Sequence, residues 1–257
     1  MRLPLMTFTT RHCGYVTLTL LTAMTPALHA ACSDPPAPRV IWVGCDKQHA
    51  DLRGADLRDA ILSRSNFSAA DLRKAQLSGA DLNFATLDQA QLDEARLEEA
   101  KLISASLVGA SLRQALLKDA SLDRANLNGT NLTEAQLSGA SLYQARIEDA
   151  DLSAATVRNS NLSQSSLRRS RLSSADLSQS NLSSSILEQA KLDHAQLIAA
   201  NLEKAALRGA DLTAADLTKA RLVGANLDNT TLTNALLDKA QWVDRRLCRD
   251  QSVGQCR

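Results

Sequence analysis

The sequence predicts an all-β solenoid, in which the chain winds into a long coil of short extended segments. The main observation is a five-residue repeat that runs from Ala50 to Asp244 without an insertion, which is 195 residues or 39 units. The first place of each unit is always Ala, Ser or Thr, and the third place is Leu in nearly every unit. A short, fixed period decides the fold before any single helix or strand is considered. The exceptions at the third place are Phe67, Ile147, Val157 and Trp242.

A period of five does not fit a single helix or a flat strand. In an α-helix, a Leu every five residues steps about 140° around the axis, so no apolar stripe forms. In a flat strand, an odd period places successive Leu residues on opposite faces. The first and third places both point inward only if the chain turns a corner after each unit. Each unit therefore has a small inward residue, an outward residue, a large inward residue and two outward bend residues.

Units such as Ala50-Asp51-Leu52-Arg53-Gly54 resemble the pentapeptide-repeat family, whose signature is A(D/N)LXX. The matching region is about three quarters of the chain. The resemblance implies a right-handed quadrilateral β-helix with one unit per side, twenty residues per coil, about ten coils and a cap at each end. The core implied is a filled column of Leu flanked by Ala, so we expect no ligand cavity and no cofactor.

Residues 1–30 have the features of a signal peptide. Arg2 and Arg11 give a basic start, residues 15–24 form an apolar run, and Leu28-His29-Ala30 offers a small-residue cleavage site. The apolar run is too short to span a membrane permanently. We therefore expect a periplasmic or secreted bacterial protein with no transmembrane span in the mature chain. An N-terminal apolar helix that caps the coil is the alternative.

A lipid anchor is the second form that an exported protein of this sequence can take. Ala30-Ala31-Cys32 resembles the end of a lipoprotein lipobox, but His29 stands where that motif has an apolar residue. Residues 31–49 are predicted to be a linker and N-terminal cap, and their Pro-rich start suits a tether as well as a loop.

Four cysteines remain after the signal peptide, and none lies in the 39 units. Cys32 and Cys45 precede the repeats, whereas Cys248 and Cys256 follow them. Two pairs, each confined to one end, favour disulfides in an oxidising compartment that hold the terminal segments over the coil ends. Metal binding is the rival interpretation, but the pairs lack CxxC spacing.

The two ends of a solenoid need caps, because the terminal coils expose strand edges and the apolar column. Residues 40–43 are predicted to be an N-terminal capping strand, and residues 245–257 are predicted to be the C-terminal cap. Trp42 and Trp242 are the only tryptophans, and we predict that each closes one end of the column.

No constellation of residues indicates catalysis. The processed chain has only two histidines, His49 and His194, and no HExxH motif, phosphate-binding Gly-rich loop or paired-Cys metal site. We therefore expect a non-enzyme. Between Ser160 and Ser185 the small inward residue is often Ser, which costs little if each hydroxyl reaches a backbone carbonyl. A polar recognition patch is the alternative interpretation of these serines.

The charge pattern bears on the choice of partner. The repeats carry 21 Lys and Arg against 25 Asp and Glu, a net charge of −4 over 39 units, with acids and bases close together. Some members of the family mimic DNA with a strongly acidic rod and bind type II topoisomerases such as gyrase in the cytoplasm. That function is the alternative here. Nucleic-acid binding is not expected, because there is no basic face and aromatics are only 3% of the residues.

If the coil has four sides, one face carries a set of outward apolar residues. Exposed apolar patches are typical of interaction surfaces, although single exposed apolar residues are common. The leading prediction is a non-catalytic, exported rod that binds an unknown protein partner or self-associates through this face. The residues of the face are Ile61, Phe84, Ile103, Tyr143 and Val223.

Overall fold

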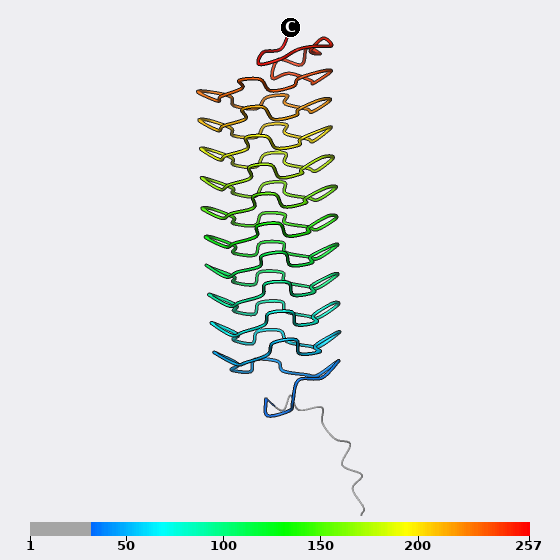
Figure 1. Ribbon diagram of the computed structural model, residues 1–257, viewed down its shortest axis with the longest axis vertical. Helices are drawn as coiled ribbons and strands as arrows, with labels where there is room; N and C mark the ends of the chain where they lie inside the picture. The colour runs from blue at the N-terminus through cyan, green and yellow to red at the C-terminus, as the bar shows by residue number, and fades with distance from the viewer. Residues whose placement is uncertain (1–31) are drawn as a thin grey trace, which may run out of the picture.

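The computed structural model describes residues 32–257, which form one rod of stacked coils with the two ends of this region at opposite ends of the rod (Figure 1). Within these residues there is no helix, and each strand is a single bridging residue. Parallel bridges join residues twenty apart, without a break from Ile41↔Ile61 to Arg221↔Gln241. Twenty residues are four units, so each coil has four sides. The predicted signal peptide, residues 1–30, lies outside the described residues.

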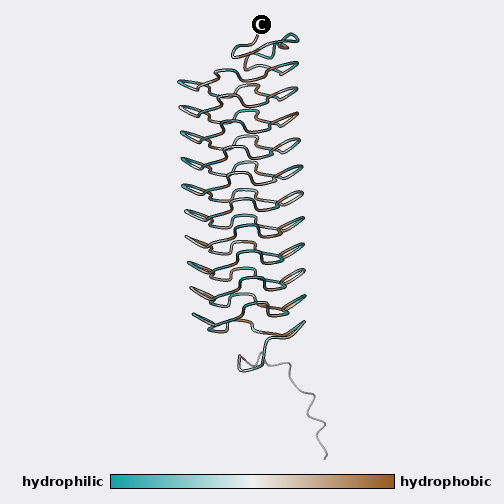
Figure 2. Ribbon diagram, in the orientation of Figure 1, coloured by the Kyte–Doolittle hydropathy of each residue, from teal (hydrophilic) through white to brown (hydrophobic). Residues whose placement is uncertain are grey.

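The burial pattern within each unit is the predicted one. Third-place side chains from Leu57 to Leu222 are at most 1% exposed, and first-place side chains from Ala60 to Ala220 are at most 2% exposed. The other three places are outward, so apolar and polar residues alternate along every coil (Figure 2). Residues of the same place stack on one another at about the 4.8 Å spacing of paired strands. The core is therefore a narrow column that is filled along its length.

The corner after each side is a hydrogen-bonded turn. The first-place N–H donates to the preceding third-place carbonyl, as Ala55 N does to Leu52 O at 3.0 Å. The fifth-place residue always has positive φ from Arg39 to Lys239, between 55° and 61° where it is not glycine. Positive φ at the third of four turn residues is the geometry of a type II turn, which favours glycine. Most corners nevertheless have a side chain there, because pairing between coils fixes the backbone.

This geometry predicts that glycine at a fifth place stabilises the rod. Ala154 has a φ of 57°, a region that costs a non-glycine residue about 1–2 kcal/mol, whereas the added freedom of glycine in the unfolded chain costs about 0.5–1 kcal/mol. Ala154→Gly should therefore raise the free energy of unfolding by about 0.5 kcal/mol, measured in urea. The neighbouring Ala155→Gly is the control, and it should lower that free energy because Ala155 is buried at a first place. A loss of stability in both variants would contradict the argument.

The inward serines are satisfied by backbone carbonyls, as predicted. The hydroxyl of Ser165 donates to Leu162 O at 2.7 Å, and the hydroxyl of Ser170 donates to Leu167 O at 2.7 Å. The same bond is made by the other serines of this section, with Ser160 using a carbonyl of the preceding coil. Each of these bonds replaces the hydrogen bond to water that the hydroxyl loses when it is buried. Serine is thus equivalent to alanine at the first place.

The coil begins earlier than the recognisable repeats. Ile41 already bridges Ile61, and residues 40–49 form two sides whose inward residues are Val40, Trp42, Cys45 and Lys47. The five-residue pattern is recognisable only from residue 50, because Val40 is not small and Lys47 is not apolar. Lys47 Nζ lies 3.7 Å from the centroid of the Trp42 ring.

The N-terminal segment is fastened to this first coil. Cys32 is bonded to Cys45, and Lys47 Nζ donates to Cys32 O at 2.7 Å. Trp42 is fully buried, with its ring centroid 6.5 Å from that of Phe67 in the next coil. Burial lowers the pKa of Lys47 from its ordinary value.

At the C-terminus the chain reverses and pairs antiparallel with the last coil. The regular turns end when positive φ moves to Arg245, and the bridges Gln241↔Leu247 and Leu236↔Val253 follow. Cys248 is bonded to Cys256 in this segment. It extends over two sides of the coil, and Trp242 is only half-buried beside it. The other two sides of this coil are residues 225–229 and 230–234, and their third-place leucines are partly exposed.

Candidate interaction surface

The five predicted surface residues lie on one face of the rod, but only three are in neighbouring coils. Ile61, Phe84 and Ile103 belong to three successive coils, and Phe84 N donates to Ile103 O at 3.0 Å. Phe84 is 56% exposed, the most of these three. Tyr143 lies two coils beyond Ile103, and Val223 lies 120 residues, or six coils, beyond Ile103. The structure therefore does not bring Tyr143 and Val223 to the same part of the face.

Two residues of the first coil extend this face, and the sequence pattern missed them. Ile41 bridges Ile61 directly, and Val43 is 42% exposed. They were missed because residues 40–49 were not recognised as sides of the coil. We refer to this part of the face as the N-terminal apolar surface, which consists of Ile41, Val43, Ile61, Phe84 and Ile103.

One cation borders this surface. The guanidinium carbon of Arg64 lies 6.0 Å from the centroid of the Phe84 ring, within reach of a cation–π contact. No carboxylate among residues 32–257 forms an ion pair with Arg64 within 4.0 Å. An aromatic ring flanked by aliphatic residues and one arginine has the composition typical of protein–protein contacts.

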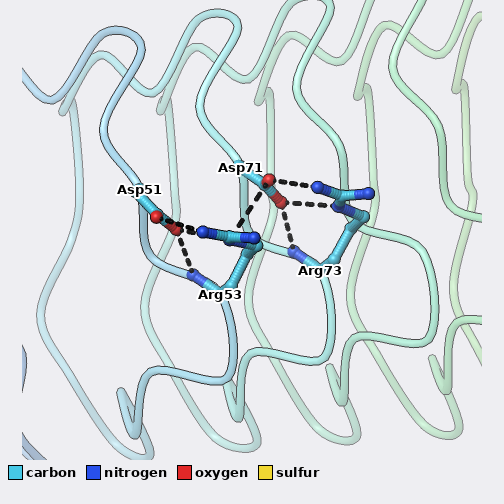
Figure 3. Close-up of polar contacts among 4 residues, drawn as sticks. All are labelled: Asp51, Arg53, Asp71 and Arg73. Carbon is cyan, nitrogen blue, oxygen red and sulfur yellow. Dashed lines mark hydrogen bonds and ion pairs between the residues drawn. The ribbon is translucent and has the colours of Figure 1, made fainter.

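Many charges on the remaining rod surface lie in ion pairs, and Figure 3 shows an example on one face. Asp51 binds Arg53 at 2.6 Å and Asp71 binds Arg73 at 2.5 Å, each pair spanning the second and fourth places of a unit. Arg53 Nε also lies 3.6 Å from Asp71 Oδ2, which joins adjacent coils. The hydrogen bond from Arg53 lowers the pKa of Asp51 to about 2. Such pairs give the rod no single-sign field.

The described residues contain no grouping that suggests catalysis. His49 and His194 are both exposed at fifth places, on different sides of the rod. No three His, Cys, Asp or Glu side chains among residues 32–257 are grouped as metal ligands. A search of the same residues finds no helix with the length and apolar character needed to cross a membrane.

Comparisons with known proteins agree with the repeat pattern. The profile of the family described as pentapeptide repeats matches in eight copies. Together these cover well over half of the chain, and the matched residues are 50–87, 80–119, 110–149, 120–159, 150–189 and 195–234. A search of curated proteins finds no match.

Several solved structures are similar to this chain. HetL, a pentapeptide repeat protein involved in heterocyst differentiation regulation in the cyanobacterium Nostoc sp. strain PCC 7120, is 32% identical, with 77% of this chain and 92% of HetL covered and a TM-score of 0.43. Full-length QnrB1, a plasmid-mediated fluoroquinolone resistance protein, is 18% identical, with 76% and 92% covered and a TM-score of 0.43. A pentapeptide repeat protein from the thylakoid lumen of Arabidopsis thaliana is 29% identical, with 39% and 64% covered and a TM-score of 0.30. By its repeats, its four-sided coil and the extent of the family match, the chain belongs to the pentapeptide-repeat family.

Proposed function

We propose that this protein is a non-catalytic rod that binds a protein partner in the periplasm or cell envelope. The observation that carries the proposal is the N-terminal apolar surface, which gathers exposed apolar side chains on a rod whose outward residues are otherwise mostly polar or charged. Phe84 is a large exposed ring on a rigid backbone, and aromatic residues of this kind dominate binding energy at interfaces. A filled column leaves the outer faces as the functional part of the rod.

The cysteines support the oxidising compartment. Each pair closes a short loop at one end, with sequence separations of 13 and 8, and disulfides of this kind persist in exported proteins. Cys32 Sγ is bonded to Cys45 and is therefore not available for a lipid thioether. The soluble mature form accordingly fits the disulfide better than a lipid anchor does. In this proposal the two terminal segments also serve as the caps of the rod, with Trp42 and Trp242 beneath them.

The alternative function, binding to a type II topoisomerase as a DNA mimic, requires a continuous acidic surface. Here arginines are interspersed with the acids and bind several of them, both within units and between coils, as in the contact of Arg169 with Asp149 at 2.7 Å. Such neutralisation weakens the resemblance to a phosphate backbone. A gyrase supercoiling assay tests this alternative directly, and inhibition at stoichiometric protein would favour it over the envelope function.

A double variant tests the N-terminal apolar surface. Phe84→Ser with Ile103→Ser should weaken self-association or binding of the envelope partner at least tenfold, because it removes the largest apolar side chain and its neighbour. Sedimentation equilibrium measures self-association, and cross-linking in periplasmic extract followed by purified binding measures the partner. The matched control is Tyr143→Ser with Val223→Ser on the same face. Equal binding by the wild type and the Phe84/Ile103 variant would contradict the proposed surface.

A further inference from the structure

A second feature lies on another face, toward the C-terminal half of the rod. It is an open hollow of about 400 Å³ that extends over successive coils, on the side of the rod that contains Arg168 and Arg208. Its walls are outward residues of the fourth and fifth places, so they are held by the rigid backbone of the coil. The lining residues are Arg168, Arg169, Glu188, Gln189, Arg208, Gly209 and Asn229.

The three arginines of the hollow differ in their partners. Arg169 binds Asp149 through two nitrogens, each at 2.7 Å, and Arg168 Nη2 lies 3.1 Å from Glu188 Oε2. Arg208 is exposed, and among residues 32–257 no carboxylate lies within 4.0 Å of its guanidinium and no side-chain acceptor binds it. The lining has three arginines and one glutamate, a formal charge of +2, which falls to +1 when Asp149 is included. The charge left without a partner belongs to Arg208.

Gly209 creates the space beside this arginine. It occupies a fifth place with a φ of 68°, where neighbouring coils carry Gln189 and Asn229. A Cβ added at Gly209 would meet only Gln189 Cγ, at 3.6 Å. The column of fifth-place side chains therefore has a gap at Gly209, with an amide side chain on the coil at either side. Amide nitrogens and a guanidinium are all hydrogen-bond donors.

A larger hollow near the N-terminal end of the rod shows that size alone does not indicate a ligand. It has a volume of about 550 Å³ and includes Arg53, Arg73 and Lys74. Each of these cations has a carboxylate of the rod within 4.0 Å: Arg53 and Arg73 bind the aspartates of Figure 3, and Lys74 lies 3.4 Å from Glu94. Its charges are satisfied without a ligand. The hollow at Gly209 differs because the guanidinium of Arg208 has no carboxylate partner among the described residues.

We propose that the hollow at Gly209 binds a phosphate group, with Arg208 as its charged ligand and the amides of Gln189 and Asn229 as neutral donors. The planar fork of an arginine matches phosphate oxygens, and charge-assisted bonds are about twice as strong as neutral ones. Glu188 opposes the anion, but its charge is neutralised by Arg168. With a single unpaired cation, the dissociation constant for inorganic phosphate is expected to be on the order of 1 mM.

Phosphate titration followed by backbone amide NMR tests the site, with chloride at equal ionic strength as the salt control. Saturable shifts at Gly209 and its neighbours are expected with phosphate and not with chloride. Arg208→Gln should weaken binding at least tenfold, and Gly209→Gln should do the same by filling the gap while leaving every charge in place. Arg113→Gln is the matched control, because Arg113 is also an exposed fourth-place arginine and has no ion-pair partner within the described region.

Glu188→Gln gives a result that loss of folding cannot imitate. It removes the opposing carboxylate and releases Arg168, so phosphate should bind several-fold more tightly. Glycerol phosphate, titrated in parallel, identifies the source: tighter binding than inorganic phosphate indicates an esterified phosphate, and equal binding indicates the free ion. Equal shifts with chloride, or unchanged phosphate binding in Arg208→Gln, would overturn the proposal.

Discussion

Leu142→Ala is expected to lower the free energy of unfolding by about 2–5 kcal/mol, the range for deleting a buried leucine side chain. Leu142 is at the middle of the rod and fully buried, between the equally buried first-place residues Ala140 and Ala145. The coils above and below place Leu122 and Leu162 at the same position. Because each bridge fixes the spacing of the coils, the column cannot collapse onto the missing side chain, so the cost should lie toward the upper part of this range.

The measurement is urea unfolding combined with hydrogen exchange, since the stability of a repeat protein is close to a sum over neighbouring repeats. Tyr143→Ala is the matched control, because Tyr143 is the next residue and points outward. It should change the free energy of unfolding by less than about 0.5 kcal/mol. A cost below about 1 kcal/mol for Leu142→Ala would mean that the column is not filled as the structure indicates.

Loss of the Cys32–Cys45 disulfide should have the next largest effect, and a local one. A loop with a sequence separation of 13 loses about 3 kcal/mol of stabilisation when its crosslink is removed, on the chain-entropy estimate, and the C-terminal loop with a separation of 8 loses about 2.5 kcal/mol. The N-terminal disulfide also holds the chain that Lys47 contacts. Its removal should therefore release the first coil, residues 40–59, before any other.

The double variant Cys32→Ser with Cys45→Ser is suited to this test. Serine is accepted at other buried first places, such as Ser165, so the substitution itself should cost little. Hydrogen exchange should accelerate at least tenfold in residues 40–59 and remain unchanged near Leu142, because each coil contacts only its neighbours. Reduction of the wild-type protein is the independent comparison. Uniform acceleration along the whole rod, or none at the first coil, would contradict this account.

The sequence was sufficient to predict the coil, since a strict period of five leaves few ways to bury Leu and Ala together. It was less informative at the first coil, where Val40 and Lys47 depart from the repeat although they occupy its inward places. It also gave no sign that side chains as large as Phe84 accept positive φ, because that conformation is imposed by pairing with the next coil. Local preference for glycine is overridden there by contacts twenty residues away.

The candidate surfaces depend on the same long-range pairing. Grouping outward residues by side placed Ile61, Phe84 and Ile103 together, but the departure from the repeat at residues 40–49 hid Ile41 and Val43. The hollow at Gly209 had no signal in a single unit, because it depends on what the adjacent coils carry and on which arginine lacks a partner. Such information is present only once residues twenty apart are aligned and their charges are counted.

The constant spacing of twenty between bridged residues gives this chain a stepwise tolerance of changes in length. Removing or duplicating twenty residues takes out or adds one full coil, so every outward residue beyond that point stays on the same side of the rod. Removing five residues is as acceptable to the core, but it rotates everything beyond it by a quarter turn. The N-terminal apolar surface and the hollow at Gly209 would then face in a new relative direction. The number of five-residue units between these two surfaces therefore determines their relative orientation around the rod.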